Sequence, residues 1–447
     1  MSTVPAVVSP SLNRRIFRAA SAVTIAGILV KLVALNKEIV VAAVYGRSDA
    51  MDAFLIALLI PGLLVNIVSE SMNQALIPAF VRMLTNDGPQ RASQLLSNAM
   101  LWSCVLLITI SLAIAVGAHL FLPFAASNYP PEKLHLALLL LYALLPSVVF
   151  TGVASNCTAV LNVLGRFAVP AIAPVITSVL VAVSALSLSS RMGIWAITAA
   201  TTCGAVLHAC WMVRLMNARR YPLRFSWFGM DEETREMVRQ YGRVLLSCVV
   251  ACSGLFVDQS MAASLPAGSV SALSYANRFV SVVLTLLGGA IASALTPAFA
   301  ELAAQGRWRK CSRTVYSWLG FAALVSVPVA LALMFGAHWL IRAAFQRGAF
   351  QAQDTAAVSP VLVMYAIQIP FFVCSRVFYR FLLAIHRADV ILWCGIVNLA
   401  LDIVLNLALM RVMGVAGIAL ATSLWTVCTF VFFGWWTYKL MPTEHDL

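Results

Sequence analysis

Ionisable side chains interrupt the first two long apolar segments of the sequence. Lys31, Lys37 and Glu38 lie within the first segment, whereas Asp52 opens the second and Glu70 lies in its later part. An ionised group inside a lipid bilayer costs roughly 2.5–3.5 kcal/mol, so such groups are retained where they face a water-filled cavity or a partner. Here the cations suit a phosphate-bearing ligand, and the carboxylates suit charge balance or a coupling cation.

The spacing places several of these groups on shared helix faces. Lys31 and Glu38 are seven residues apart, and Asp52 and Glu70 are eighteen apart; these separations correspond to about two and about five helical turns. Asn66 precedes Glu70 by one turn and extends the polar stripe of the second helix. These residues could line one cavity. Alternatively, a lysine pairs with Glu38 and only fixes helix packing.

Composition places the chain among polytopic membrane proteins. Of its 447 residues, 62% are hydrophobic and 11% are charged, which excludes an ordinary soluble domain. The ten cysteines show no Cys-x-x-Cys or Cys/His metal spacing, so we predict no metal site. The excess of 30 Lys and Arg over 17 Asp and Glu is explained largely by the charge asymmetry of membrane loops, and we expect no nucleic-acid partner.

Hydrophobic segments predict an all-α integral membrane protein with about twelve transmembrane helices in two six-helix lobes. The expected spans are 19–45, 50–80, 95–120, 135–161, 167–189, 193–215, 238–263, 269–299, 312–335, 356–383, 388–410 and 414–438. We expect an N-terminal tail at 1–18, a first lobe at 19–215, a linker at 216–237, a second lobe at 238–438 and a tail at 439–447. No connection is long enough for a soluble catalytic domain, so we predict no catalytic residues and no enzyme.

Basic residues are distributed unevenly over the connections between these helices. With the N-terminus in the cytoplasm, nineteen of the 30 Lys and Arg residues fall on the cytoplasmic side, six fall outside and five lie within helices. Because cytoplasmic loops carry the excess of basic residues, both termini are predicted to be cytoplasmic.

The two halves of the chain contain related segments. Residues 75–80 read ALIPAF and residues 294–299 read ALTPAF, which indicates parallel repeats with a substrate cavity between them. The seventh and eighth helices then correspond to the first hairpin. They contribute Asp258, Asn277 and Arg278 to the candidate site.

Other polar residues of the second half have simpler interpretations. Arg376 and Arg380 are one turn apart, and Arg380 could either face the cavity or extend to the cytoplasmic surface. Asp402 lies one turn from both Asn398 and Asn406. That group could belong to the functional intramembrane residues, but we favour the interpretation as a polar cluster that packs helices together.

Several segments share the pattern of a known family. They are Asp52-Ala-Phe54, Ile60-Pro-Gly-Leu-Leu64, Glu70, Gln74-Ala-Leu-Ile-Pro78, Leu161–Pro170, Leu265–Arg278, Phe345–Phe350 with Asp354 and Thr355, and Gly414–Ser423. Together they resemble the MviN/MurJ family of lipid II flippases, within the multidrug/oligosaccharidyl-lipid/polysaccharide exporter superfamily. The resemblance covers nearly the whole chain, and it implies a V-shaped bundle of two six-helix lobes that works by alternating access.

The sequence departs from the family pattern at charged positions. Lys31 and Lys37-Glu38 stand where the family has Arg and Arg-Asp, Val65-Asn66 replaces Arg-Arg, and Asn277 replaces Asp. Lysine keeps the charge of arginine but loses its bidentate geometry toward phosphate. Typical members also resemble this chain extended by two C-terminal helices. These differences suit another undecaprenyl-linked glycan, such as an exopolysaccharide repeat unit.

We therefore hypothesise a flippase that moves an undecaprenyl-pyrophosphate-linked glycan, either lipid II or an exopolysaccharide repeat unit, to the outer leaflet of the bacterial cytoplasmic membrane. No cofactor is expected apart from a coupling H⁺ or Na⁺ ion, or the membrane potential. We expect a monomer among membrane lipids, with envelope glycan synthesis proteins as further candidate partners. The candidate head-group ligands are Lys31, Lys37, Asn66, Asn277 and Arg278, and the charge-balancing or ion-coupling residues are Glu38, Asp52, Glu70 and Asp258.

Three other functions stay open at this point. An ion-coupled exporter of small amphiphilic compounds would need acids more than the cations present here. A second alternative function is that of a non-transporting partner in an envelope-assembly complex. A membrane glycosyltransferase would need an acidic metal-binding motif in a water-exposed loop. The acidic run Asp231-Glu-Glu233 is instead interpreted as a helix start that complements the helix dipole.

Overall fold

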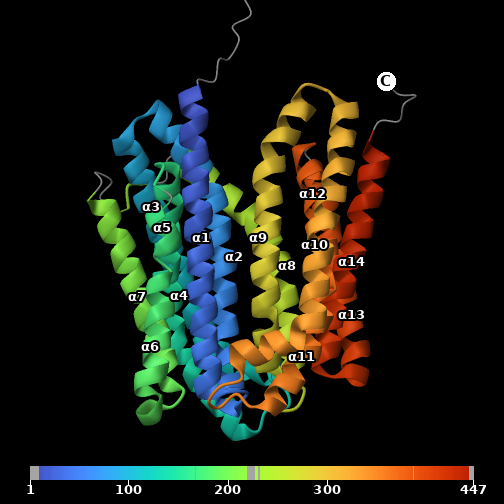
Figure 1. Cartoon of the computed structure of the whole chain (residues 1–447). Coiled ribbons are helices and arrows are strands. Elements are labelled where there is room, and N and C mark those ends of the chain that lie inside the picture. The colour runs from blue at the N-terminus through green and yellow to red at the C-terminus, as the bar shows by residue number, and fades with distance from the viewer. Residues whose placement is uncertain (1–9, 167, 219–226, 230–231, 386, 442–447) are drawn as a thin grey trace, which may run out of the picture. The chain divides into compact units, whose positions relative to one another are not determined.

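The computed structural model describes residues 10–166, 168–218, 227–229, 232–385 and 387–441. These residues form fourteen α-helices and no strand, which confirms the all-α membrane fold predicted from composition. The helices are α1 (Pro10–Tyr45), α2 (Asp49–Asn86), α3 (Pro89–Ala125), α4 (Pro131–Val163), α5 (Ala168–Ile172), α6 (Val175–Met192), α7 (Trp195–Asn217), α8 (Glu232–Ala263), α9 (Ser269–Ala304), α10 (Trp308–Phe345), α11 (Ala352–Ala366), α12 (Gln368–Ala384), α13 (Ala388–Met413) and α14 (Val415–Leu440) (Figure 1).

Within the described residues, ten segments are long and apolar enough to cross a membrane. Two of the ten contain a break: one combines α5 with α6, and the other combines α11 with α12. The remaining long helices, α1 and α8, have 36 and 32 residues, well above the ~20 residues that span a bilayer. The order of helices therefore follows the predicted order of spans.

Proline accounts for one of the two breaks and accompanies the other. Pro174 separates α5 from α6, and it has no N–H to continue a helical ladder. Ile367 separates α11 from α12, and Pro370 lies in the first turn of α12, where backbone N–H groups have no helical partner. In contrast, α2 runs through Pro78 and α9 through Pro297 without interruption.

Packing divides the chain into two compact units. Unit 1 comprises Met1–Glu38, Leu64–Ala115 and Ala143–Leu245, and unit 2 comprises Ile39–Leu63, Val116–Tyr142 and Leu246–Leu447. The end of α1, the start of α2, the end of α3 and the start of α4 thus pack with the second half of the chain. The predicted lobes at 19–215 and 238–438 follow chain order and stay a prediction.

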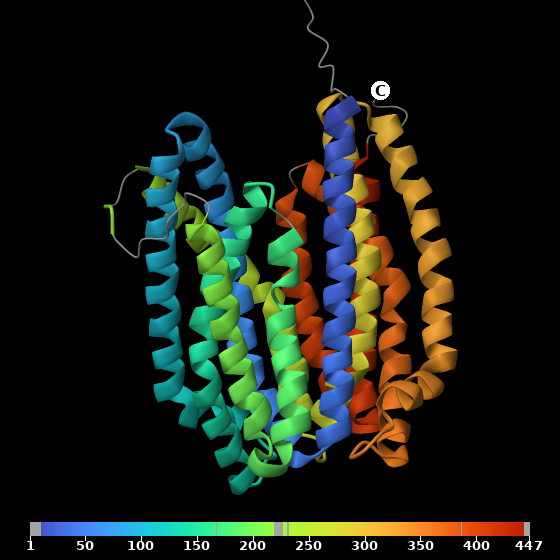
Figure 2. The same ribbon diagram turned by 60° about the vertical axis from the view of Figure 1, so that its left-hand side comes forward.

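Unit 1 is held together by an apolar core among α2, α3, α4 and α7. Phe80, Leu96, Cys157 and Met212 are among its fully buried side chains, and α6 and α7 pack along each other as a hairpin (Figure 2). Asn98 of α3 accepts a hydrogen bond from the Phe228 N–H at 2.9 Å and donates one to the Gly229 carbonyl at 2.9 Å. This amide therefore fixes residues 227–229 against the unit.

Unit 2 is built around α9, which packs against α11 and α12, with α10 and α14 beside these. Four aromatic rings fill the space between α9 and the α10–α11 turn. Tyr275 and Phe279 of α9 contact Phe345 and Phe350, with ring centroids 5.2–5.8 Å apart. Such tilted and edge-on ring pairs stabilise the packing beyond the burial of apolar area. They hold the first turns of α9 against the α10–α11 turn.

Candidate functional site

Asp52 of α2 binds the N-terminus of α9. Its two carboxylate oxygens accept backbone N–H bonds from Gly268 at 2.7 Å and from Ser271 at 2.9 Å. The first N–H groups of a helix lack partners within the helix, and the helix dipole favours an anion there. Gly268 itself offers no side-chain cap. An acid from the first half of the chain therefore caps a helix of the second half.

Lys133 of α4 provides the counter-charge to Asp52. Its Nζ lies 3.3 Å from Asp52 Oδ2 and 2.6 Å from Asp49 Oδ1, and the ring of Tyr129 lies 4.1 Å away. Asp52 and Lys133 are 1% and 8% exposed, so water screens this pair weakly. Burial, followed by the charges of Asp52 and Asp49, raises the pKa of the Tyr129 phenol above its usual value, and the phenol stays neutral.

Further contacts join the same turns. Arg47, in the α1–α2 turn, donates Nε–H to the Gly268 carbonyl at 3.0 Å and lies 3.5 Å from the Asp354 carboxylate at the start of α11. Asn128, in the α3–α4 turn, donates to the Ser264 carbonyl at 3.2 Å. We call the group of Arg47, Asp49, Asp52, Lys133, Gly268, Ser271 and Asp354 the Asp52 cluster.

Two glycines allow the turns to approach this closely. Gly46 has φ +56°, and a Cβ atom there would lie 2.7 Å from the Ala349 carbonyl oxygen. Gly348 has φ +57°, and a Cβ atom there would collide with the Ala43 carbonyl oxygen. With both glycines in place, the Ala349 N–H donates to Ala43 at 2.7 Å, and the Tyr275 hydroxyl donates to Gly46 at 2.9 Å. The α1–α2 and α10–α11 turns are therefore in backbone contact.

A second group of polar residues, the Asp258 cluster, joins α8, α13 and α14. Asn406 donates its Nδ2 to Asp258 at 2.8 Å and to Asp402 at 3.1 Å. The Thr422 hydroxyl lies 3.1 Å from Asp258 Oδ2 and 3.1 Å from the Ile418 carbonyl. Asp258 and Asp402 are 7% and 2% exposed. Among the described residues, neither carboxylate has a Lys or Arg partner.

Two oxygen atoms of the Asp258 cluster lack hydrogen-bond donors. Asp402 Oδ2 and Asn406 Oδ1 are buried and have no partner within the described part of the chain. A buried oxygen without a partner is costly and calls for a water or an ion. Carboxylate, amide and hydroxyl oxygens are the ligands of hard cations, and a proton would also relieve the repulsion between two carboxylates. The chemistry of this donor set fits Na⁺ or H⁺.

The predicted site residues of unit 1 include one ion pair. Lys37 Nζ lies 2.8 Å from Glu38 Oε1; Lys37 is half-buried and Glu38 is buried, whereas Lys31 and Asn66 are exposed. The Lys37–Glu38 pair is the contact that the helix-packing alternative predicted. Lys31, the other lysine of α1, is exposed. The side chain of Glu70 lies outside the described part of the structure.

The remaining predicted residues lie in unit 2. Asn277 is half-buried and Arg278 is exposed on α9, two turns beyond the end that Asp52 caps. Asp52, Asp258 and these two residues thus belong to one unit, and Asp52 and Asp258 lie in different clusters. The roles assigned to all nine residues stay predictions.

Sequence reasoning missed the partners of both clusters. Lys133 was counted only as one of six basic residues in outer loops, although a cation at that boundary could have suggested a partner for Asp52. Asp402 and Asn406 were interpreted as helix packing with Asn398, but Asn398 binds Thr429 at 2.8 Å instead. The link from Asp402 to Asp258 passes through Asn406, which is 148 residues away from Asp258.

The helix arrangement matches a class of membrane transporters. The structure superposes with a TM-score of 0.77 on a multidrug resistance MATE family transporter of the MOP superfamily in its inward-facing conformation, at 15% identity over 93% of this chain and 98% of that chain. It superposes with a TM-score of 0.80 on "Lipid II flippase MurJ, inward closed conformation", at 21% identity over 94% of this chain and 88% of that chain. At identities of 15% and 21%, these superpositions establish the fold alone.

Sequence comparison gives the family. The model of the family "Lipid II flippase MurJ" matches residues 41–445, so the chain belongs to the MurJ family, as the resemblance predicted. A "Probable lipid II flippase MurJ" of Synechocystis sp. is 23% identical over 429 residues, 92% of this chain and 79% of that protein. The "Lipid II flippase MurJ" of Burkholderia cenocepacia is 26% identical over 365 residues, 79% of this chain and 70% of that protein. The protein is a multi-pass membrane transporter and not an enzyme.

Proposed function

We propose that the protein moves an undecaprenyl-pyrophosphate-linked glycan across the bacterial cytoplasmic membrane by alternating access, with lipid II as the first candidate. Membership of the MurJ family supports a flippase, and the names of its relatives support lipid II. The structural observation that carries the mechanism is the Asp52 cluster. It ties turns from the first half of the chain to turns from the second half at one end of unit 2.

The Asp52 cluster suits a closure that must open and reform. The positive-inside rule predicts that the α1–α2, α3–α4, α8–α9 and α10–α11 turns face the outside. The contacts of the Asp52 cluster are hydrogen bonds and ion pairs, whose groups can be rehydrated when the turns separate. Release of the head group outside would then require Asp52 to leave the N-terminus of α9.

The candidate cations predicted from the sequence would bind the pyrophosphate. Lys37 carries Glu38 as its counter-ion at 2.8 Å, and a pyrophosphate head group could take the place of that carboxylate. Lys31, Asn66, Asn277 and Arg278 complete the proposed head-group set. Since Val65-Asn66 and Asn277 reduce the charge that the family pattern supplies, an exopolysaccharide repeat unit remains the second candidate substrate.

The Asp258 cluster would hold the coupling cation, either Na⁺ or H⁺. The ligands would be Asp258, Asp402, Asn406 and Thr422, of which the two acids and the amide already share one hydrogen-bond network. A bound monovalent cation would neutralise one of the two carboxylate charges and relieve their repulsion. Membrane potential would add about 2.3 kcal/mol per charge and per 100 mV.

Complementation tests the proposed substrate. The chain is expressed in bacteria depleted of their own lipid II flippase, and its amount in the membrane is measured. We expect growth and lipid II export with the wild type and with Lys37→Arg, and about a tenfold or greater loss with Lys37→Ala, because a charge-assisted contact to phosphate disappears.

Three other outcomes are informative. Lysis despite normal amounts of protein in the membrane would exclude lipid II and direct the assay to surface polysaccharide in a deletion strain. Normal surface polysaccharide in that strain would leave the flippase proposal without a glycan substrate. Full activity of Lys37→Ala would remove Lys37 from the head-group site.

A further inference from the structure

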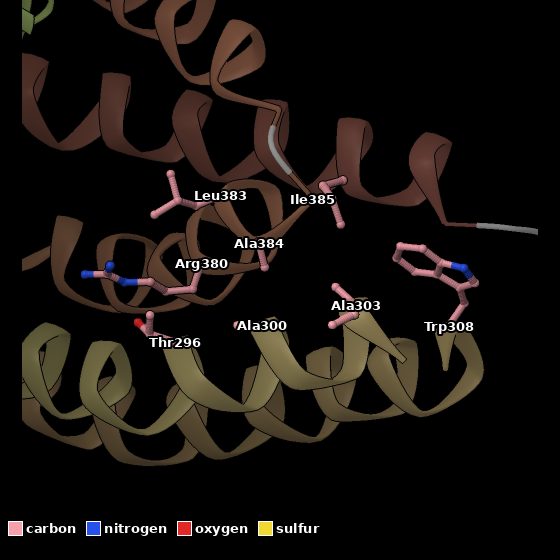
Figure 3. A pocket seen from close by; sticks show the side chains of 9 residues that line it. Thr296, Ala300, Ala303, Trp308, Arg380, Leu383, Ala384 and Ile385 are labelled. Carbon is pink, nitrogen blue, oxygen red and sulfur yellow. The ribbon is translucent and has the colours of Figure 1, made fainter. Parts of the chain in front are cut away.

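A cavity of about 530 Å³ lies at the end of unit 2 where α9 ends, α10 begins and α12 ends. Ligand sites in proteins typically measure about 300–1,000 Å³, so this cavity can hold a small group. Alanines dominate the lining, and their short side chains leave the space open. The lining residues are Thr296, Ala300, Ala303, Ala304, Trp308, Arg380, Leu383, Ala384 and Ile385 (Figure 3).

Arg380 makes one end of this cavity cationic. Its Nε is buried and has no hydrogen-bond partner among the described residues, and no described carboxylate pairs with its guanidinium. Arg376, one turn earlier, lies over the Phe372 ring at 4.2 Å and is not among the lining residues. Glu301 is exposed and accepts a hydrogen bond from Gln305 at 3.0 Å. The cavity therefore presents an unsatisfied donor to an anion.

Aromatic and basic residues indicate the level of the membrane at which the cavity lies. Trp308 lines it at the end opposite Arg380 in Figure 3. At the same end of unit 2, Lys439 lies 5.4 Å from the Trp436 ring, and Arg387 lies 5.4 Å from the same ring. Tryptophan and basic side chains gather where membrane meets water, so the cavity lies at the level of lipid head groups.

We propose that this cavity binds the phosphate of an anionic glycerophospholipid from the adjoining leaflet. Arg380 donates its N–H groups to the phosphate, Trp308 borders the glycerol, and the alanines and Leu383 contact the first methylene groups of the tails. This site would exist independently of the proposed transport activity.

The lining favours a phospholipid over the glycan carrier. Thr296 is the one hydroxyl among the cavity-lining residues, whereas a sugar needs several polar partners when it leaves water. Arg278, the proposed pyrophosphate ligand on α9, is eighteen residues from Thr296, or about 27 Å along a helix. The two sites are therefore separate on the same helix.

Native mass spectrometry of the full chain tests this site. The protein is purified in non-ionic detergent and mixed with phosphatidylglycerol or phosphatidylcholine, and the retained lipid is counted. We expect the wild type to retain one phosphatidylglycerol in preference to phosphatidylcholine. Arg380→Gln should lower its affinity about tenfold, as for one lost charge-assisted hydrogen bond, and Arg380→Lys should lower it less.

Two further variants separate the site from general effects. Ala300→Leu fills the cavity at an exposed position and should lower phosphatidylglycerol retention without a change in charge, even if Arg380→Gln fails to fold. Arg309→Gln removes an exposed cation at the same end and should have no effect. Equal losses in Arg309→Gln and Arg380→Gln, equal retention of both lipids, or displacement of phosphatidylglycerol by undecaprenyl pyrophosphate would each overturn the proposal.

Discussion

Unit 2 contains two buried carboxylate sites with opposite hydrogen-bond balance. Around Asp52, both carboxylate oxygens accept backbone N–H bonds and a lysine completes the neutralisation. Around Asp258, a second acid replaces the lysine, and two oxygen atoms remain without donors. The first site has its hydrogen-bond partners within the protein chain, whereas the second has two oxygen atoms that a water, a proton or a metal cation could satisfy.

This difference distinguishes a structural contact from a candidate ion site. A carboxylate with all its partners in the protein stabilises the conformation in which those partners meet. A pair of carboxylates with missing donors destabilises the protein while the site is empty, and a bound cation would remove that cost. Mutations at the two sites should therefore act with different signs on the stability of the protein without added ions.

The largest effect is expected for Asp52→Ala. It leaves Lys133 buried with the exposed Asp49 as its remaining carboxylate partner and leaves two N–H groups at the start of α9 unbonded, and breaking such a buried pair costs about 3–5 kcal/mol. In a cysteine-free background, maleimide labelling of Val270→Cys, a position with 0% exposure, should become much faster. The double variant Asp52→Ala/Lys133→Met should recover part of the lost thermal stability. Equal labelling rates with and without Asp52 would exclude the closure.

A smaller effect with a reversed sign is expected for Asp402→Asn. The wild type should be stabilised by NaCl relative to choline chloride, by about 2.7 kcal/mol at a hundredfold excess of ion over its Kd. Removing one of two adjacent carboxylates relieves their repulsion, so the variant should be more stable than the wild type in choline chloride and insensitive to Na⁺. Thermal unfolding in detergent measures both quantities. If neither protein responds to Na⁺, the same comparison across pH tests a proton instead.

The smallest effect is expected for Arg47→Gln. The Arg47–Asp354 pair is partly exposed and 3.5 Å long, so the variant loses mainly the hydrogen bond to Gly268, or about 1 kcal/mol. Asp389→Asn is the matched control, because Asp389 pairs with Arg387 at the surface and its loss should leave the melting temperature unchanged. A larger loss in the control than in Arg47→Gln would mean that the Asp52 cluster contributes little.

The helices could be predicted from the sequence because a membrane span is encoded locally, by a long apolar run with polar ends. Asp258 was also identified as a candidate ion ligand, since an acid inside a span is conspicuous. Its partner Asp402 was assigned to packing because the register between α8 and α13 depends on the tertiary fold. The cap on α9 was missed for another reason: its donors are backbone N–H groups, which every residue type except proline provides.

The use of backbone donors has a consequence for how this protein can vary. Asp52 recognises the N–H groups of Gly268 and Ser271, so replacement of Ser271 by another small residue leaves the donor in place. No side chain at the start of α9 has to change together with Asp52. Amino-acid covariation between position 52 and the start of α9 would therefore fail to reveal this contact.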